Sequence, residues 1–289
     1  MAADRSGPEQ GTPLPHRAAP WLDWLRTRYG VARSLAIYYG KPWRFATMDR
    51  FYARFIGEGD LCFDIGAHVG NRIRSWRSLG ARVIALEPQP SLMATLRLLY
   101  GRDANVHLHP QAIAREPGTV DLHLNLDNPT IGTTDVRFID RAAQAASFHG
   151  QRWQRVIEVP ATTLDRLIDV HGEPRFIKID VEGFEAEALA GLSRPVFAVS
   201  VEFVPMAQDV AQAALDRLTE LGDYRFNASY GDTMRLIHPQ PLGREAIGDW
   251  LRSQGEDGPA GDIYACLAPQ TLTHQLTKPR RLQVKPTAG

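Results

Sequence analysis

The sequence predicts an α/β protein with a mostly parallel sheet, and three neighbouring features support this prediction. An apolar run at 61–65 leads into a turn that contains Gly66 and Gly70, and a helical segment follows the turn. A second apolar run, at 82–86, ends at the acidic residue Glu87. Strand, glycine turn, helix, strand and acid, in this order, are typical of doubly wound α/β proteins that bind an adenosine-containing ligand.

The rest of the chain continues the alternation of strands and helices. Apolar spacing predicts two short helices within 21–39, separated at Gly30, and a third helix at 48–56. The polar segment 127–146 is expected to be an irregular loop with room for one short helix. Further helices are expected at 71–79, 92–100, 163–170, 185–192 and 206–221, and strands at 106–109, 119–126, 156–159, 176–179 and 196–203. A final group, which supplies an antiparallel closing strand, consists of strands at 224–230, 234–237 and 262–267 and a helix at 244–252.

Composition and charge exclude several classes of protein. The 289 residues carry no formal net charge, which argues against a nucleic-acid binder that relies on overall positive charge. No apolar run approaches the roughly 20 residues that span a bilayer, and the N-terminus lacks the apolar centre of a signal peptide. We therefore expect a cytoplasmic protein. Cys62 and Cys266 lie in predicted apolar strands, so they are expected to be core thiols without a disulfide framework.

The glycine turn favours S-adenosylmethionine over a dinucleotide. A dinucleotide fingerprint has three glycines, but here Ile73 occupies the place of the third. Asp64, two residues before the first glycine, would attract a cationic amine and repel a pyrophosphate. S-adenosylmethionine carries an ammonium group, a sulfonium and a ribose, and it has no phosphate. Glu87 at the end of the second strand can accept hydrogen bonds from both ribose hydroxyls.

A third segment indicates the family. Residues 178–185 read K-I-D-V-E-G-F-E, which is the end of a strand followed by acids and a glycine. Together with D-I-G-A at 64–67, L-E-P at 86–88 and T-T-L-D at 162–165, this string resembles the FkbM-type family of S-adenosylmethionine-dependent methyltransferases. The resemblance covers roughly residues 38–267. It implies a Rossmann-like class I methyltransferase fold and O-methylation of a hydroxyl on a sugar, polyketide or other small metabolite.

The expected cofactor site combines the glycine turn with the ends of several strands. In the family's pattern, the polar residue before Ala112 can reach the adenine, and Gln111 occupies that place. The residues expected to bind S-adenosylmethionine are Asp64, Gly66, Ala67, His68, Gly70, Asn71, Glu87, Pro88, Gln111, Ala112 and Asp180.

Acids at strand ends are the candidates for catalysis. An alcohol has a pKa of about 16, so methyl transfer to it needs a base or a metal. Asp180 and Glu182 end one predicted strand and Glu202 ends the next, so all three can meet at one edge of the sheet. His68, inside the glycine turn, is a further candidate base. The alternative is that the acids pair with Lys178, Arg175 or backbone amides. Carboxylates can hold a divalent metal, but no histidine stands beside them, and no metal site is predicted.

Composition and apolar patterning also divide the chain into segments. We expect a disordered tail at 1–20, an N-terminal helical cap at 21–58, the methyltransferase domain at 59–268 and a basic C-terminal tail at 269–289. The cap could cover a sheet edge, form a lid over the cofactor or support a homodimer. The loop at 128–134 is expected to face the substrate, which would be a small hydroxylated acceptor and not a nucleic acid.

Two other interpretations stay open from the residues. An NAD-dependent oxidoreductase would also use a glycine turn, but the missing third glycine and the absence of a Tyr-x-x-x-Lys pair count against it. A catalytically inactive scaffold that still binds cofactor would keep the same motifs. Binding without turnover would distinguish that case from an enzyme.

Overall fold

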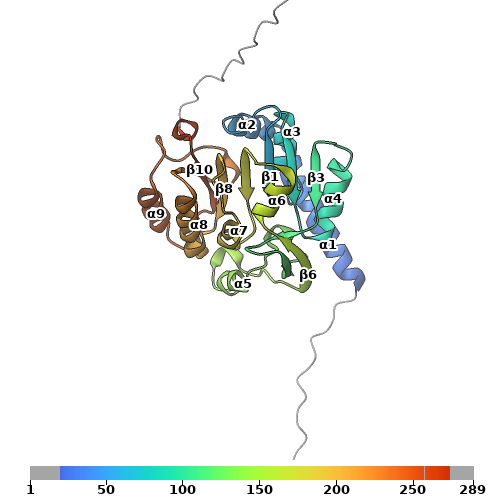
Figure 1. Ribbon diagram of the computed structural model, residues 1–289. Coiled ribbons are helices and arrows are strands. Elements are labelled where there is room, and N and C mark those ends of the chain that lie inside the picture. The colour runs from blue at the N-terminus through green and yellow to red at the C-terminus, as the bar shows by residue number, and fades with distance from the viewer. Residues whose placement is uncertain (1–19, 257, 274–289) are drawn as a thin grey trace, which may run out of the picture.

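The computed structural model describes residues 20–256 and 258–273, and it confirms an α/β fold around one large sheet (Figure 1). The strands are, in spatial order, β3 (Val106–His109), β2 (Arg82–Leu86), β1 (Leu61–Ile65), β7 (Phe176–Ile179), β8 (Ala198–Phe203), β10 (Gly261–Cys266) and β9 (Arg225–Tyr230). The first five pair in parallel, and β10 runs antiparallel to both of its neighbours. The predicted antiparallel closing strand is therefore present.

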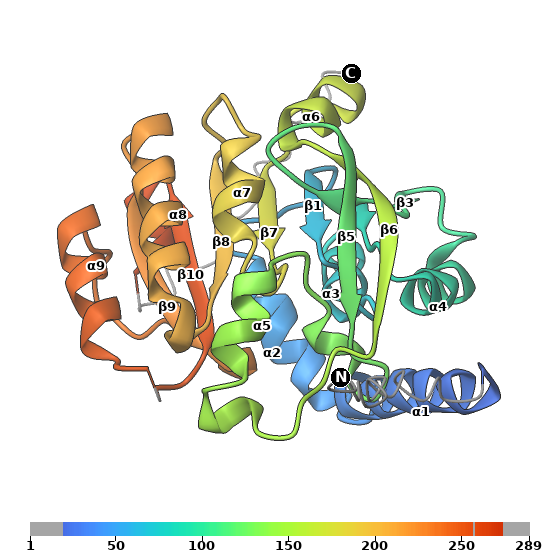
Figure 2. The same ribbon diagram turned by 90° about the horizontal axis from the view of Figure 1, so that it is seen from below.

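Helices cover both faces of this sheet (Figure 2). On one face lie α2 (Trp43–Tyr52), α3 (Asn71–Ser78) and α4 (Pro90–Tyr100), and on the other lie α6 (Leu164–His171), α7 (Glu185–Ala190), α8 (Gln208–Leu221) and α9 (Arg244–Ser253). Side chains alternate between the faces, as strand geometry requires. In β1, Phe63 joins the core beneath α6–α9, and Cys62 joins the core beneath α2–α4. Both Cys62 and Cys266 are fully buried free thiols, as predicted.

A second, smaller sheet adjoins the first. It consists of β4 (Ala112–Ile113), β6 (Arg155–Thr162) and β5 (Gly118–Leu124), with β6 parallel to β4 and antiparallel to β5. The strands expected at 119–126 and 156–159 are thus real, but they pair with each other and not with the main sheet. The segment between them contains η1 (Pro129–Ile131), α5 (Val136–Ala142) and η2 (Ala146–Phe148), and α5 is the short helix expected in that loop.

The N-terminal helix corrects one prediction. Residues expected to form two helices form a single continuous helix, α1 (Pro20–Tyr39). Gly30 does not break it, because it is the point where the helix contacts the loop after β5. A Cβ at Gly30 would lie 2.8 Å from Cδ of Pro129 and 3.2 Å from the carbonyl oxygens of Leu126 and Asp127. Glycine at this position permits close packing and does not mark a helix end.

The C-terminal half departs from the predictions at two places. Residues 234–237 are not a strand, because Met234 has a left-handed backbone with φ of 53° that interrupts extended structure. The predicted start of the C-terminal tail, at residue 269, is wrong. Pro269–Leu272 form a short helix, η5, and Leu272 is fully buried. Arg54 Nη1 donates to the carbonyl of Thr273 at 2.7 Å, which ties this end to the domain. The predicted tail at 1–20 and the rest of the C-terminal tail lie almost entirely outside the described residues.

Membrane-spanning helices are not found in the part of the chain that the structure describes. None of its helices combines the length and the apolar character that crossing a bilayer requires.

Gly66 lets two strand ends approach each other. Its φ is 85°, and a Cβ there would lie 1.9 Å from the carbonyl oxygen of Asp180. We expect Gly66→Ala to lower the free energy of unfolding by roughly 2–5 kcal/mol, because it adds a steric clash to an unfavourable left-handed backbone. The matched control is Gly59→Ala, which has a φ of 80° but open space around it and should lose only roughly 1–2 kcal/mol. Urea denaturation measures both, and equal losses would contradict this account.

Candidate active site

A cleft opens at the carboxyl edge of the main sheet, above β1, β2 and β7. This is the edge at which ligands bind in doubly wound sheets, beside the point where the strand order reverses. The structure brings eight of the predicted site residues together in its walls. They are Gly66, His68, Glu87, Pro88, Gln111, Ala112, Asp180 and Glu182. The loop expected to face the substrate also reaches the cleft, through Pro129, Thr130, Gly132 and Thr134.

Four residues predicted to bind cofactor lie behind these walls. As far as the described residues show, Asp64, Ala67, Gly70 and Asn71 do not line the cleft. Gly70 is the N-cap of α3, with a φ of 79°, and packs against Tyr100, and Asn71 lines a separate cavity. Asp64 is buried within β1, and its Oδ2 has no hydrogen-bond partner among the described residues. That these four residues bind cofactor stays a prediction.

Backbone hydrogen bonds hold the glycine turn against the end of β2. The amides of Gly66 and Ala67 both donate to the carbonyl of Leu86, at 3.0 and 2.9 Å. His68 has a φ of 51°, which is unfavourable for a residue with a Cβ. Its amide donates to Oε2 of Glu87 at 2.9 Å. The turn is consequently fixed before any ligand arrives.

Glu87 links the turn to the cleft. Besides His68, it accepts a hydrogen bond from the amide of Gln89 through Oε1, at 2.9 Å. Only 3% of Glu87 is exposed, and burial raises the pKa of its carboxyl to about 8, although the two amides act in the opposite direction. Glu87 thus supports the fold as well as facing the cleft.

A buried ion-pair network lies beneath the acids. Lys178 is completely buried, and its Nζ lies 2.6 Å from Oδ1 of Asp262 and 3.1 Å from Oδ2 of Asp180. Arg72 Nη2 approaches the same Oδ2 at 3.6 Å. Burial alone would raise the pKa of Asp180, but Lys178 and Arg72 lower it to about 2. The predicted alternative of pairing with Lys178 is therefore correct for Asp180, whereas Arg175 contacts the carbonyl of Phe55 instead.

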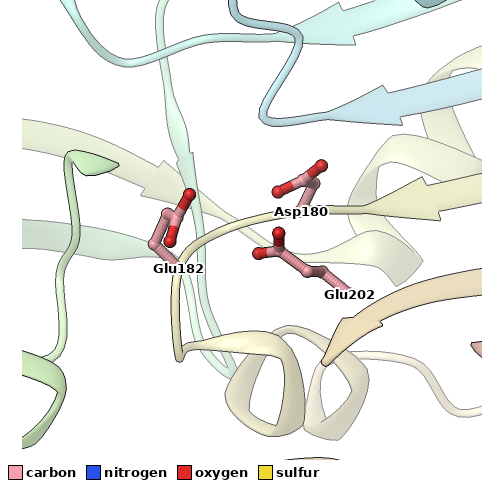
Figure 3. A group of neighbouring side chains, drawn as sticks. All are labelled: Asp180, Glu182 and Glu202. Carbon is pink, nitrogen blue, oxygen red and sulfur yellow. The ribbon is translucent and has the colours of Figure 1, made fainter. Parts of the chain in front are cut away.

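Glu182 and Glu202 form no ion pair with any described residue, although a side-chain hydrogen bond with Glu202 also lowers the pKa of Asp180. One carboxylate oxygen from each of Asp180, Glu182 and Glu202 can be chosen so that all three lie within 4.8 Å of one another (Figure 3). Burial, and then the charge of Asp180, raise the pKa of both glutamates well above the usual range. Glu182 has a φ of 53°, and Thr133 Oγ1 donates to its carbonyl at 2.7 Å. The strained backbone is thus held in place by a neighbouring loop.

A second cavity shares one lining residue, Glu182, with the cleft. Its walls include Asn128, Ile131, Phe148, Glu182, Glu202 and Pro205. Glu182 lines both the cleft and the second cavity. In the described part of the chain, Glu202 lines the second cavity but not the cleft. The three acids therefore line two cavities, with Glu182 common to both.

Sequence reasoning missed two contributors to the site, Arg72 and Asp262. Arg72 and Asp262 complete the buried ion-pair network, and Tyr38, at the end of α1, lines the cleft and packs edge-on against His68 at 5.3 Å. Signals for the first two exist in the sequence. An arginine in the first turn of a helix opposes the helix dipole, and an aspartate in an otherwise apolar strand requires a buried partner.

The order of the strands and the antiparallel β10 define a Rossmann-like class I methyltransferase fold. The model of the family described as the methyltransferase FkbM domain matches residues 64–226, more than half of the 289 residues. The chain belongs to this FkbM methyltransferase family, as the sequence predicts. It is an S-adenosylmethionine-dependent methyltransferase, and the alternative of an NAD-dependent oxidoreductase is overturned by the family match.

Several crystal structures are remotely similar. Precorrin-6y C5,15-methyltransferase from Geobacter metallireducens has a TM-score of 0.40 and 14% identity, covering 77% of this chain and 87% of its own. Aeropyrum pernix fibrillarin with natively bound S-adenosyl-L-methionine has a TM-score of 0.38 and 11% identity, covering 73% and 68%. An rRNA methylase from Streptococcus thermophilus has a TM-score of 0.37 and 14% identity, covering 76% and 93%. No curated protein matches the chain. The family assignment rests on the family match and the strand order.

The cleft fits the cofactor of this family. Gly66 presents only backbone to the cleft, and Nε2 of His68 is buried without a hydrogen-bond partner among the described residues. Apolar walls at Leu86 and Ile113 suit an adenine, and the carboxylate of Glu87 suits a ribose. The cleft therefore has the apolar and the acidic surfaces that S-adenosylmethionine requires.

The pKa of Glu87 predicts a pH dependence of stability. In the folded chain its carboxyl keeps a proton up to about pH 8, whereas the unfolded chain releases it near the ordinary value of 4.5. The stability of the wild type should therefore fall, relative to Glu87→Gln, as pH rises between these values, by at most about 1.4 kcal/mol per pH unit. Urea denaturation at a series of pH values gives both slopes. Glu187→Gln, at a partly exposed pair with Arg115, should keep the wild-type slope. Parallel curves for wild type and Glu87→Gln would contradict the raised pKa.

Proposed function

We propose that this methyltransferase transfers the methyl group to a hydroxyl of a small metabolite or sugar. The observation that supports the proposal is the position of Glu182, which lines both the cofactor cleft and the second cavity. A carboxylate at that junction can reach a molecule on either side. A hydroxyl needs such a proton acceptor, because its own pKa of about 16 leaves almost none of it ionised.

In this proposal, different residues of the cleft bind different parts of the cofactor. Glu87 accepts hydrogen bonds from the ribose, and Gln111 with Ala112 borders the adenine. Asp180 and the backbone at Gly66 receive the methionine end, where the ionised Asp180 carboxylate balances an ammonium group. S-adenosylmethionine supplies a methyl group bound to a cationic sulfur. Holding the methyl donor and the acceptor in the reactive orientation can lower the activation barrier by roughly 7–11 kcal/mol.

Among the acids, Glu182 is the proton acceptor that we propose. Asp180 is a weak base, because Lys178 and Arg72 hold its pKa at about 2. His68 is also weak, since burial lowers the pKa of its imidazole to about 4. Glu182 combines a raised pKa with contact to the second cavity, so it can take the hydroxyl proton as the acceptor oxygen receives the methyl group. Glu202 then lies on the acceptor side and orients that molecule.

The second candidate function is an inactive scaffold. Turnover with a hydroxylated acceptor would distinguish the enzyme from such a scaffold. A scaffold would bind S-adenosylmethionine and show no turnover with any hydroxylated compound. A small acceptor, rather than a nucleic acid, agrees with the zero net charge. The cytoplasmic location and the homodimer stay predictions.

Glu182→Gln separates binding from chemistry. Calorimetry should give the same affinity for S-adenosylmethionine as the wild type within about threefold, since the substitution keeps the shape of the side chain. Turnover should fall roughly 100-fold or more, because the amide cannot accept a proton. Turnover is measured as release of S-adenosylhomocysteine with a panel of sugars and other hydroxylated compounds.

The control for this experiment is Glu187→Gln, which removes a carboxylate from α7 at the partly exposed pair with Arg115. It should keep both affinity and turnover. Full turnover in Glu182→Gln would show that the base lies elsewhere, and wild-type binding without turnover across the panel would favour the scaffold.

A further inference from the structure

Three carboxyl groups lie close together at the ends of two neighbouring strands, and only Asp180 forms an ion pair with a described residue. Asp180 follows β7 directly, Glu182 lies in the same turn, and Glu202 lies near the end of β8 (Figure 3). One oxygen of each lies within 4.8 Å of the others. Like charges at this distance repel strongly in a partly buried site. Such an arrangement is stable only if the carboxyls share protons or if a cation lies between them.

A second observation indicates a cation. Only 7% of Glu182 is exposed, yet its carboxylate makes no hydrogen bond or ion pair with any described residue. Oε2 of Glu202 is shut off from solvent and has no partner in the described chain, whereas the same carboxyl also forms a side-chain hydrogen bond with Asp180. The contrast with Glu185 is informative, because that buried carboxylate accepts the amides of Val181 and Gly183 at 3.0 and 3.1 Å. Buried polar groups ordinarily have partners, so the free oxygens of Glu182 and Glu202 point to a missing ligand.

The neighbouring positive side chains leave room for that ligand. Lys178 and Arg72 both contact the same oxygen of Asp180, Oδ2. The other oxygen, Oδ1, is not used in either contact. Lys178 is further neutralised by Asp262 at 2.6 Å, which reduces its repulsion of a nearby cation.

We propose that Asp180, Glu182 and Glu202 bind one divalent cation of the Mg²⁺ or Mn²⁺ type. A set of carboxylate oxygens without nitrogen or sulfur suits hard cations of this kind. Three protein ligands leave further positions for water and for an oxygen of another molecule. Because the cluster lines both the cleft and the second cavity, that molecule would be the methyl acceptor.

The role of the cation rests on the proposed function, whereas its binding does not. A hydroxyl bound to a divalent cation loses its proton more readily than a free one. The proton would pass to a carboxylate oxygen of Glu182 that the cation leaves free. The site therefore selects acceptors that present an oxygen donor to the cation.

Manganese binding tests the proposal directly. The full-length protein is freed of metal with a chelator and titrated with Mn²⁺, and electron paramagnetic resonance measures the free ion. We expect one saturable site per chain in the wild type. Glu202→Gln should weaken it roughly tenfold or more, and Glu182→Gln should do the same. Glu187→Gln, outside the cluster, should bind as the wild type does, and circular dichroism checks that each variant is folded.

Two results would overturn the cation site. One is the absence of saturable Mn²⁺ binding by the wild type, which would mean that the carboxyls share protons. The other is binding by a folded Glu202→Gln or Glu182→Gln variant that equals the wild type. Calorimetry with S-adenosylmethionine on the same samples keeps the two proposals apart. A wild type that fails to bind the cofactor would defeat the proposed function and leave the Mn²⁺ result fully interpretable.

Discussion

The arrangement of the site depends on the buried ammonium of Lys178. This group belongs to a residue of β7 and is completely buried, and it contacts Asp180 and Asp262 at 3.1 and 2.6 Å. A buried charge that loses its partner costs roughly 3–5 kcal/mol, so the two aspartates hold the ends of their strands together. The backbone of Asp180 is fixed in turn, since its amide donates to the carbonyl of Ile65 at 3.0 Å and its own carbonyl occupies the space that Gly66 leaves free.

That constraint connects the cofactor side of the cleft to the acceptor side. The end of β7 abuts the glycine turn, so the position of one loop determines the position of the other. Both loops contain a non-glycine residue with a left-handed backbone, His68 at 51° and Glu182 at 53°. Each such residue costs of order 1–3 kcal/mol unless its surroundings hold it. Here the holding contacts are visible, with Glu87 accepting the amide of His68 and Thr133 donating to the carbonyl of Glu182.

The parallel strands, the glycine turn and the acidic strand ends could be predicted because each leaves a local pattern in the sequence. Apolar runs of four to six residues identified β1, β2, β7 and β8, and the edge at which their carboxyl ends meet follows from the fold class. Gly30 could not be interpreted locally, since only the distant Pro129 explains why a glycine is needed inside a helix. The ion-pair roles of Arg72 and Asp262 could not be predicted for the same reason. Their partners lie far away in the sequence and meet them only in the folded chain.

Glu182 and Glu185 show where sequence reasoning must yield to geometry. They stand three residues apart in one motif, carry the same side chain and are both buried, at 7% and 3% exposed. Glu185 accepts hydrogen bonds from the backbone of its own loop, which makes it a structural residue. Glu182 faces two cavities and has no such partner in the described chain. The same loop therefore uses one carboxylate to hold its shape and leaves the other available for chemistry.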